Sequence, residues 1–302
     1  MNKKINPLKG PLFRSTEIKN NFKLYSQKTE SDYWVMIGGE RRPTQATILT
    51  SEDSGLVKMD EKNPQLGIYE REFINRFHPD NIDSREFWKE ATNKFPLFSI
   101  TGGIQNINNV SQANIVTLEM AKQLGCLDII NDLYFKKPNI SLLEIGPGYG
   151  GFQQYIADKF GDDHYYAIDV NPLFDHPRLY QTDGKTIPEN VPSHLDAIYS
   201  VNVFQHLSKS QRTSYYKQLS RLLGYGGLFI FSMFVVTDKN KEWKGWGCKD
   251  KNGRIYTSFF KQLTEVDTLD ELISELTGFG FAVVIINPDA QIPYFSFKCT
   301  KV

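Results

Sequence analysis

Residues 142–151, Leu142-Leu143-Glu144-Ile145-Gly146-Pro147-Gly148-Tyr149-Gly150-Gly151, decide the fold. The apolar run Ile140–Ile145 predicts a short strand, and the spacing in Gly151–Phe160 predicts a helix. Glycines between a strand and a helix let the backbone approach a ligand, and the first turn of the helix offers free N–H groups. The stretch therefore predicts a nucleotide-binding turn in an α/β domain.

Strand and helix patterns alternate around this turn. Strands are predicted at Tyr165–Val170, Leu195–Val201, Gly227–Val235, Phe281–Ile286 and Tyr294–Thr300, and helices at Ser208–Leu223, Thr268–Thr277 and from Ser111 to about Gly125. Such alternation indicates a mainly parallel sheet with helices on both faces.

The acidic residues near the turn bear on the kind of nucleotide. Gly146, Gly148 and Gly151 also fit the dinucleotide fingerprint G-x-G-x-x-G, so a nicotinamide oxidoreductase is one alternative. Glu144, two residues before the first glycine, suits a ligand with a cationic amino-acid group better than a pyrophosphate. Asp169 ends the next strand, where it can accept hydrogen bonds from two ribose hydroxyls, as either class of nucleotide needs.

In this order and spacing, the motifs resemble the class I S-adenosylmethionine-dependent methyltransferases over about residues 112–302. The resemblance lies in Glu144–Gly150, Asp169, Asp183, the fourth-strand segment 196–207, the fifth-strand entry 222–227 and Gly278–Phe281. Gln205 stands where the family usually has Glu before His206. The resemblance implies a Rossmann-like, seven-stranded sheet whose last strand, Tyr294–Thr300, is antiparallel.

The resemblance also implies a cofactor, S-adenosylmethionine, and the residues that bind it. These are Glu144, Gly146, Pro147, Gly148, Tyr149, Gly150, Asp169, Val170, Asp183, Gly184, Ser200, Asn202 and Val203. Asp169 takes the ribose and Asp183 the adenine amino group. Because these two acids then have roles, and no other carboxylate pair has a clear ligand spacing, no metal is expected.

A narrower resemblance concerns the acceptor. The glycine motif, together with the doublet Tyr165-Tyr166, is similar to bacterial sugar O-methyltransferases of surface-polysaccharide and antibiotic pathways. This implies a small-molecule acceptor, a sugar hydroxyl or glycoconjugate. N-methylation of an amine or amino sugar, and an inactive binding protein built on the same fold, remain open.

His206, just beyond the fourth strand, is the candidate general base for a hydroxyl acceptor, with a structural role as the alternative. Trp243, Arg254 and Tyr256 lie in the segment 236–264, which we expect either to bind the acceptor or to pack on the N-terminal region. In the same segment, Asn252-Gly253 predicts a hairpin turn.

The chain divides into a mixed α/β accessory region, residues 1–110, and the methyltransferase domain, residues 111–302. Aromatic residues from Tyr69 to Phe98 predict that the accessory region packs on the core, on the acceptor side or at a subunit interface, and Phe73 and Phe77 suit a short helix. Lys+Arg and Asp+Glu are both 35, so no basic excess suggests nucleic-acid binding. With no signal peptide and no apolar window of membrane-spanning length, a cytoplasmic enzyme is expected.

Overall fold

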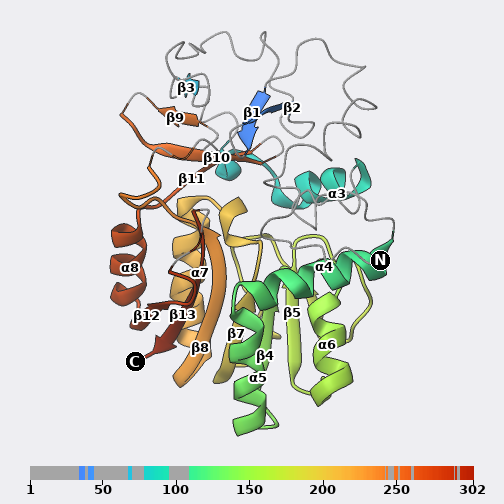
Figure 1. Ribbon diagram of the computed structural model, residues 1–302. Helices are drawn as coiled ribbons and strands as arrows, with labels where there is room; N and C mark the ends of the chain where they lie inside the picture. Colours follow the sequence, from blue (N-terminus) through green and yellow to red (C-terminus); the bar gives the residue numbers. More distant parts are fainter. Residues whose placement is uncertain are drawn as a thin grey trace, which may run out of the picture.

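The computed structural model describes residues 34–37, 40–43, 67–69, 78–94, 109–241, 243, 248–250, 252–259, 262–288, 290 and 293–302. Figure 1 shows a large sheet with its helices, a smaller group of strands beyond one edge of it, and α3 (Ser84–Lys94) between the two. Within the described residues, no helix is long and apolar enough to cross a membrane. The expected helix at Phe73 and Phe77 lies outside the described residues.

The large sheet has seven strands in the order β12-β13-β8-β7-β4-β5-β6. Their bounds are β4 Leu142–Ile145, β5 Tyr165–Asp169, β6 Leu179–Gln181, β7 Leu195–Ser200, β8 Leu223–Phe234, β12 Phe281–Ile285 and β13 Tyr294–Lys301. Strands β4 to β8 pair in parallel, whereas β13 lies antiparallel between β8 and β12. The predicted seven-stranded sheet with an antiparallel last strand is confirmed.

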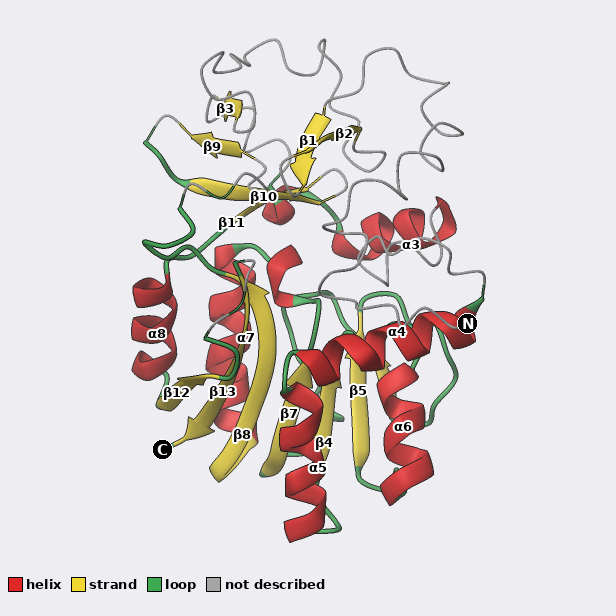
Figure 2. Cartoon of the chain, viewed as in Figure 1, coloured by secondary structure: helices red, strands yellow, loops and turns green. Residues whose placement is uncertain are grey.

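Helices cover both faces of this sheet (Figure 2). On one face pack α4 (Val110–Gln123), α5 (Cys126–Lys136) and α6 (Gly151–Phe160), and on the other pack α7 (Lys209–Leu222) and α8 (Leu269–Gly278). Alternation along β4 divides its side chains: Leu142 joins the first core, and Leu143 and Ile145 join the second. Burial on both faces explains why this strand is a continuous apolar run apart from Glu144.

The helix starts follow local capping. Ser208 and Thr268 each form a capping box, which fixes the predicted starts of α7 and α8. The start expected at Ser111 is corrected to Val110, because Asn109 accepts a hydrogen bond from the Gln112 N–H at 2.9 Å. Beyond the left-handed Gly125 (φ 73°), α5 is a further helix that the sequence pattern did not predict.

A small sheet joins distant parts of the chain, in the order β11-β10-β9-β3. Its strands are β3 Gly67–Tyr69, β9 Cys248–Asp250, β10 Ile255–Phe259 and β11 Gln262–Glu265. Strand β3 pairs in parallel with β9, so the N-terminal region and the segment 236–264 share this sheet. The predicted turn at Asn252-Gly253 is confirmed, with Gly253 at φ 83° between β9 and β10. A separate pair joins β1 (Trp34–Ile37) to β2 (Glu40–Pro43).

Candidate functional site

A cleft opens where the parallel strands β4, β5 and β7 end. It encloses about 1090 Å³ between atoms, a figure that includes the part open to solvent. Of the residues predicted from sequence, its lining includes Glu144, Gly146, Pro147, Gly148, Asp169, Val170, Gly184, Asn202, Val203 and His206. Ser84, Trp88 and Thr92 of α3 also line it.

The glycine turn forms the floor of this cleft because its backbone is left-handed. Gly146 has φ 72°, and its N–H donates to the carbonyl oxygen of Ile168 at 2.9 Å. A Cβ on Gly146 would collide with the side chain of Val203, so this position needs glycine for space as well as for conformation. Gly150 (φ 78°) is the N-cap of α6 and, like Tyr149, is not in the lining.

Glu144 is a buried carboxyl group at the edge of the cleft, 5% exposed. It accepts a hydrogen bond from the hydroxyl of Tyr165. Burial raises the pKa of Glu144 to about 8, against the opposing effect of that hydrogen bond. The protonated form therefore dominates at pH 7 unless a positive group lies beside it.

Asp169 ends β5 and points its carboxylate into the turn. Oδ1 accepts a hydrogen bond from the Asn171 N–H at 2.8 Å. Burial raises the pKa of Asp169 to about 6, and backbone N–H groups of Asn171, Gly148 and Val170 oppose that rise. The carboxylate is therefore mostly ionised at pH 7, as an acceptor for two hydroxyl groups should be.

Asp183 lies outside the lining and is exposed. Its Oδ1 accepts from the N–H groups of Lys185 at 2.8 Å and Thr186 at 2.7 Å. Burial alone would raise the pKa of Asp183, but these backbone hydrogen bonds lower it below its usual value. The carboxylate thus shapes the loop that brings Gly184 to the cleft, and its contact with adenine stays a prediction.

The segment after β7 mixes lining and supporting residues. The buried hydroxyl of Ser200 donates to the carbonyl oxygen of Ile145 at 3.1 Å and so ties β7 to β4, outside the lining. Asn202 has the left-handed φ 63°. Its Oδ1 accepts from the hydroxyl of Tyr294 at 2.6 Å, which fixes this residue at the cleft.

His206 is buried in the cleft wall, 7% exposed. The ring of Trp88 meets it edge-on, with ring centroids 5.0 Å apart. Burial lowers the pKa of His206 to about 3, so its imidazole is neutral throughout the physiological range. A group with so low a pKa is a weak general base at pH 7. The catalytic role of His206 stays a prediction.

The three residues predicted to bind the acceptor do not line this cleft. Trp243 stacks on Phe234 with ring centroids 6.0 Å apart, and Tyr256 is buried, 8% exposed. Arg254 pairs with Glu265 and, through Nη1, with Oε1 of Glu271 at 2.7 Å. The charge of Arg254 is therefore already neutralised by carboxylates of the protein itself.

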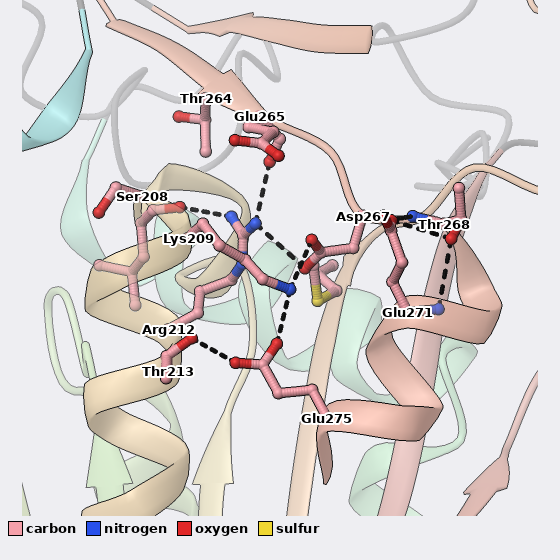
Figure 3. Close-up of polar contacts among 12 residues, drawn as sticks. Ser208, Lys209, Arg212, Thr213, Thr264, Glu265, Asp267, Thr268, Glu271 and Glu275 are labelled. Atoms are coloured by element: carbon pink, nitrogen blue, oxygen red, sulfur yellow. Dashed lines mark hydrogen bonds and ion pairs between the residues drawn. The ribbon is translucent and has the colours of Figure 1, made fainter. Parts of the chain in front are cut away.

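Nη2 of Arg254 lies 3.8 Å from Oδ1 of Asp267, which belongs to a charged cluster between α7, β11 and α8. Figure 3 shows the members of this cluster around Asp267. The guanidinium of Arg212 lies 3.1 Å from Oδ2 of Asp267, and the ammonium of Lys209 contacts Asp267 at 2.9 Å and Glu275 at 2.6 Å. Arg212 also donates to the carbonyl oxygen of Leu207 at 2.6 Å. Since Leu207 lines the cleft, the cluster supports the cleft wall from behind.

Known methyltransferases are similar to part of this chain. Residues 119–285 match the family model described as a methyltransferase domain. Malonyl-[acyl-carrier protein] O-methyltransferase 1 of Ilyobacter polytropus is 26% identical over 168 residues, or 53% of this chain. The chain spans 59% of the length of that curated relative.

Solved methyltransferase structures are similar at low identity. One is a putative S-adenosylmethionine-dependent methyltransferase from Listeria monocytogenes, 17% identical, TM-score 0.42, covering 54% of this chain and 91% of that one. Another is magnesium protoporphyrin IX methyltransferase from Synechocystis with bound SAH, 12% identical, TM-score 0.47, covering 72% and 100%. Because the family model covers more than half of the chain, the protein belongs to the methyltransferase domain family.

Proposed function

We propose that this protein is an S-adenosylmethionine-dependent methyltransferase that acts on a small, uncharged acceptor. The observation that carries the proposal is the pair of acids, Glu144 and Asp169, on the two sides of the left-handed glycine turn in one cleft. A ligand with an ammonium group and a ribose suits both acids, because the ammonium group can pair with Glu144 and the ribose hydroxyls can donate hydrogen bonds to Asp169. A pyrophosphate beside Glu144 would keep this acid from ionising, whereas an ammonium group would favour its ionised form.

The residues present fit this cofactor. Glu144 faces its amino-acid end, Asp169 takes the ribose hydroxyls, and the Gly146 backbone allows close approach. The cofactor supplies a methyl group on a sulfonium, which is already a good leaving group. The work of the chain is to orient the acceptor in line with that methyl group and to exclude water.

The charge of the lining supports an uncharged acceptor. Among the described residues that line the cleft there are two carboxyl groups, Glu144 and Asp169, and no Lys or Arg. An acceptor with a carboxylate or phosphate would therefore find no cation to pair with among the described lining residues. A sugar hydroxyl, as the narrower resemblance implies, fits this environment.

A second candidate acceptor is a neutral amine. Burial keeps the pKa of His206 near 3, which makes the imidazole a weak base for a hydroxyl. An amine in its neutral form needs less help because its lone pair is already nucleophilic. The observation that favours this alternative is therefore the burial of His206.

Calorimetric titration of the full chain with S-adenosylhomocysteine (SAH) and with NADH tests the cofactor. We expect binding of SAH and none of NADH, and the reverse result would overturn the proposal. Incubation with methyl-labelled S-adenosylmethionine and matched sets of neutral sugars, amino sugars and sugar acids tests the acceptor. Label in the sugar acids alone would contradict the uncharged acceptor, and label on nitrogen would select the amine.

A further inference from the structure

Residues 78–94 of the N-terminal region lie over the cleft and form hydrogen bonds with the core at three places. Near its start, Oδ1 of Asp80 accepts hydrogen bonds from the hydroxyls of Ser208 and Ser210, both at 2.7 Å. In α3, Nε of Arg85 donates to the carbonyl oxygen of Thr182 at 3.1 Å. Near the end of α3, Nδ2 of Asn171 donates to Oγ1 of Thr92 at 3.4 Å. Residues 78–94 are thus tied to segments that follow β7, β6 and β5.

One face of α3 lines the cleft. Ser84, Trp88 and Thr92 follow at intervals of four residues, so they lie on the same side of the helix. Thr92 is 7% exposed, and a Cβ placed on Gly184 would lie 3.4 Å from Cβ of Ser84. Figure 1 shows α3 beyond the edge of the sheet at which the cleft opens.

The contacts of α3 lie at one end of the cleft. Asn171, Thr182 and Gly184 follow β5 and β6, on the same side as Asp169. In the proposed function this is the ribose and adenine side. Trp88 reaches from there to His206 across the opening.

We propose that α3 is a wall of the cofactor site, with Ser84, Trp88 and Thr92 contacting the adenosyl group of S-adenosylmethionine. Asp80 is a positioning residue that holds this wall against α7. The inference rests on the proposed function and adds that the cofactor site is built from both the N-terminal region and the core. Release of the cofactor then requires α3 to move away from the core.

The test uses the full chain, with SAH and adenosine as probes. Stacking of a base on an aromatic ring predicts that Trp88→Ala weakens binding of both probes at least about fivefold, while Trp88→Phe retains most of the affinity. Asp80→Asn should speed SAH dissociation in stopped-flow measurements and leave its association rate little changed. Asp196→Asn is the matched control, because Asp196 bonds Lys137 and Ser141 outside the cleft and should leave both rates unchanged.

Hydrogen exchange of the wild-type chain gives a second measurement that needs no variant. SAH should slow exchange of the backbone amides within residues 84–94. Unchanged exchange there, or wild-type affinity for SAH and adenosine in a folded Trp88→Ala variant, would overturn this inference. Failure of the wild-type chain to bind SAH at all would instead overturn the proposed function.

Discussion

Arg212 and Asp267 are both completely buried, and Nη2 of the arginine lies 3.1 Å from Oδ2 of the aspartate. The arginine also bonds the carbonyl oxygens of Leu207 and Glu265, so it joins the cleft wall to the small sheet. We predict that Arg212→Met lowers the free energy of unfolding by about 3–5 kcal/mol, because it removes the guanidinium that pairs with the buried carboxylate of Asp267. Urea denaturation measures this. Lys137→Met, which breaks an exposed pair with Asp196, should cost less than about 1 kcal/mol. Equal losses of unfolding free energy in the two variants would contradict the prediction that the buried pair stabilises the fold more than the exposed pair does.

Gly146→Ala should abolish SAH binding or prevent folding, because the new methyl group meets the Val203 side chain. Gly161→Ala is the matched control: Gly161 has a similar φ, 79°, but a Cβ there meets nothing within 4 Å. Gly161 has ψ 155°, a backbone region that is essentially restricted to glycine, so the control should suffer conformational strain alone, roughly 1–3 kcal/mol. Calorimetry measures SAH binding by both variants, and thermal melting measures their stability. Equal losses in the two variants would contradict the prediction that the contact with Val203 adds to the backbone strain at Gly146.

Asp169→Ala should weaken SAH binding by about tenfold or more. Charge-assisted hydrogen bonds contribute about 1.5–3 kcal/mol each, and a ribose offers two hydroxyls to this carboxylate. Titration of 5′-deoxy-5′-methylthioadenosine, which keeps the ribose but lacks the amino-acid end, should show the same loss. An unchanged affinity for both ligands would place the ribose elsewhere.

Glu144 links cofactor binding to proton release. Its folded pKa, about 8, lies above the usual 4.5, so the free protein holds this proton at pH 7. A cationic group beside it favours the ionised form, so SAH should bind more tightly as pH rises from about 6 to 8. Heats of binding in phosphate and in Tris should differ by the released proton, and Glu144→Gln should abolish that difference. The raised pKa also means that ligand-free stability falls as pH rises from about 4.5 to 8.

His206 should make the protein acid-sensitive. Its folded pKa, about 3, lies below the usual 6.5, so its contribution is complete above pH 6.5 and is lost as pH falls toward 3. His206→Gln should flatten the dependence of stability on pH across that window, as measured by urea denaturation at several pH values. If His206 is also the general base, His206→Ala should reduce turnover about 10²–10⁴-fold with SAH affinity unchanged. Near-native turnover of a stable variant would exclude that role.

The sequence predicted the architecture well where local chemistry decides it. Glycines at 146, 148 and 150 and the capping residues Ser208 and Thr268 act within a few positions of themselves, so their elements were predictable. Helix α5 was not predicted, because Gly125 indicates an end of α4 but not the start of a second helix.

The candidate site was predictable only in part, for the same physical reason. Glu144 and Asp169 follow the glycine turn and the next strand, and both reach the cleft. Trp88 is distant in sequence and reaches the cleft through docking of α3, which no local pattern encodes. Arg254 pairs with Glu265 and Glu271, which are 11 and 17 residues away in the sequence, and no local pattern predicts those contacts. A role of Arg254 in acceptor binding stays a prediction.

The antiparallel strand β13 has a consequence for how the chain is made. It fills the position between β8 and β12, yet it is synthesised after both. While the polypeptide emerges from the ribosome, β12 has no neighbour in the sheet, and the backbone N–H and C=O groups along one edge of β8 lack their partners in β13. A nascent chain that stops before Tyr294 therefore leaves two strand edges unpaired, and the sheet is completed only when the final strand has been made.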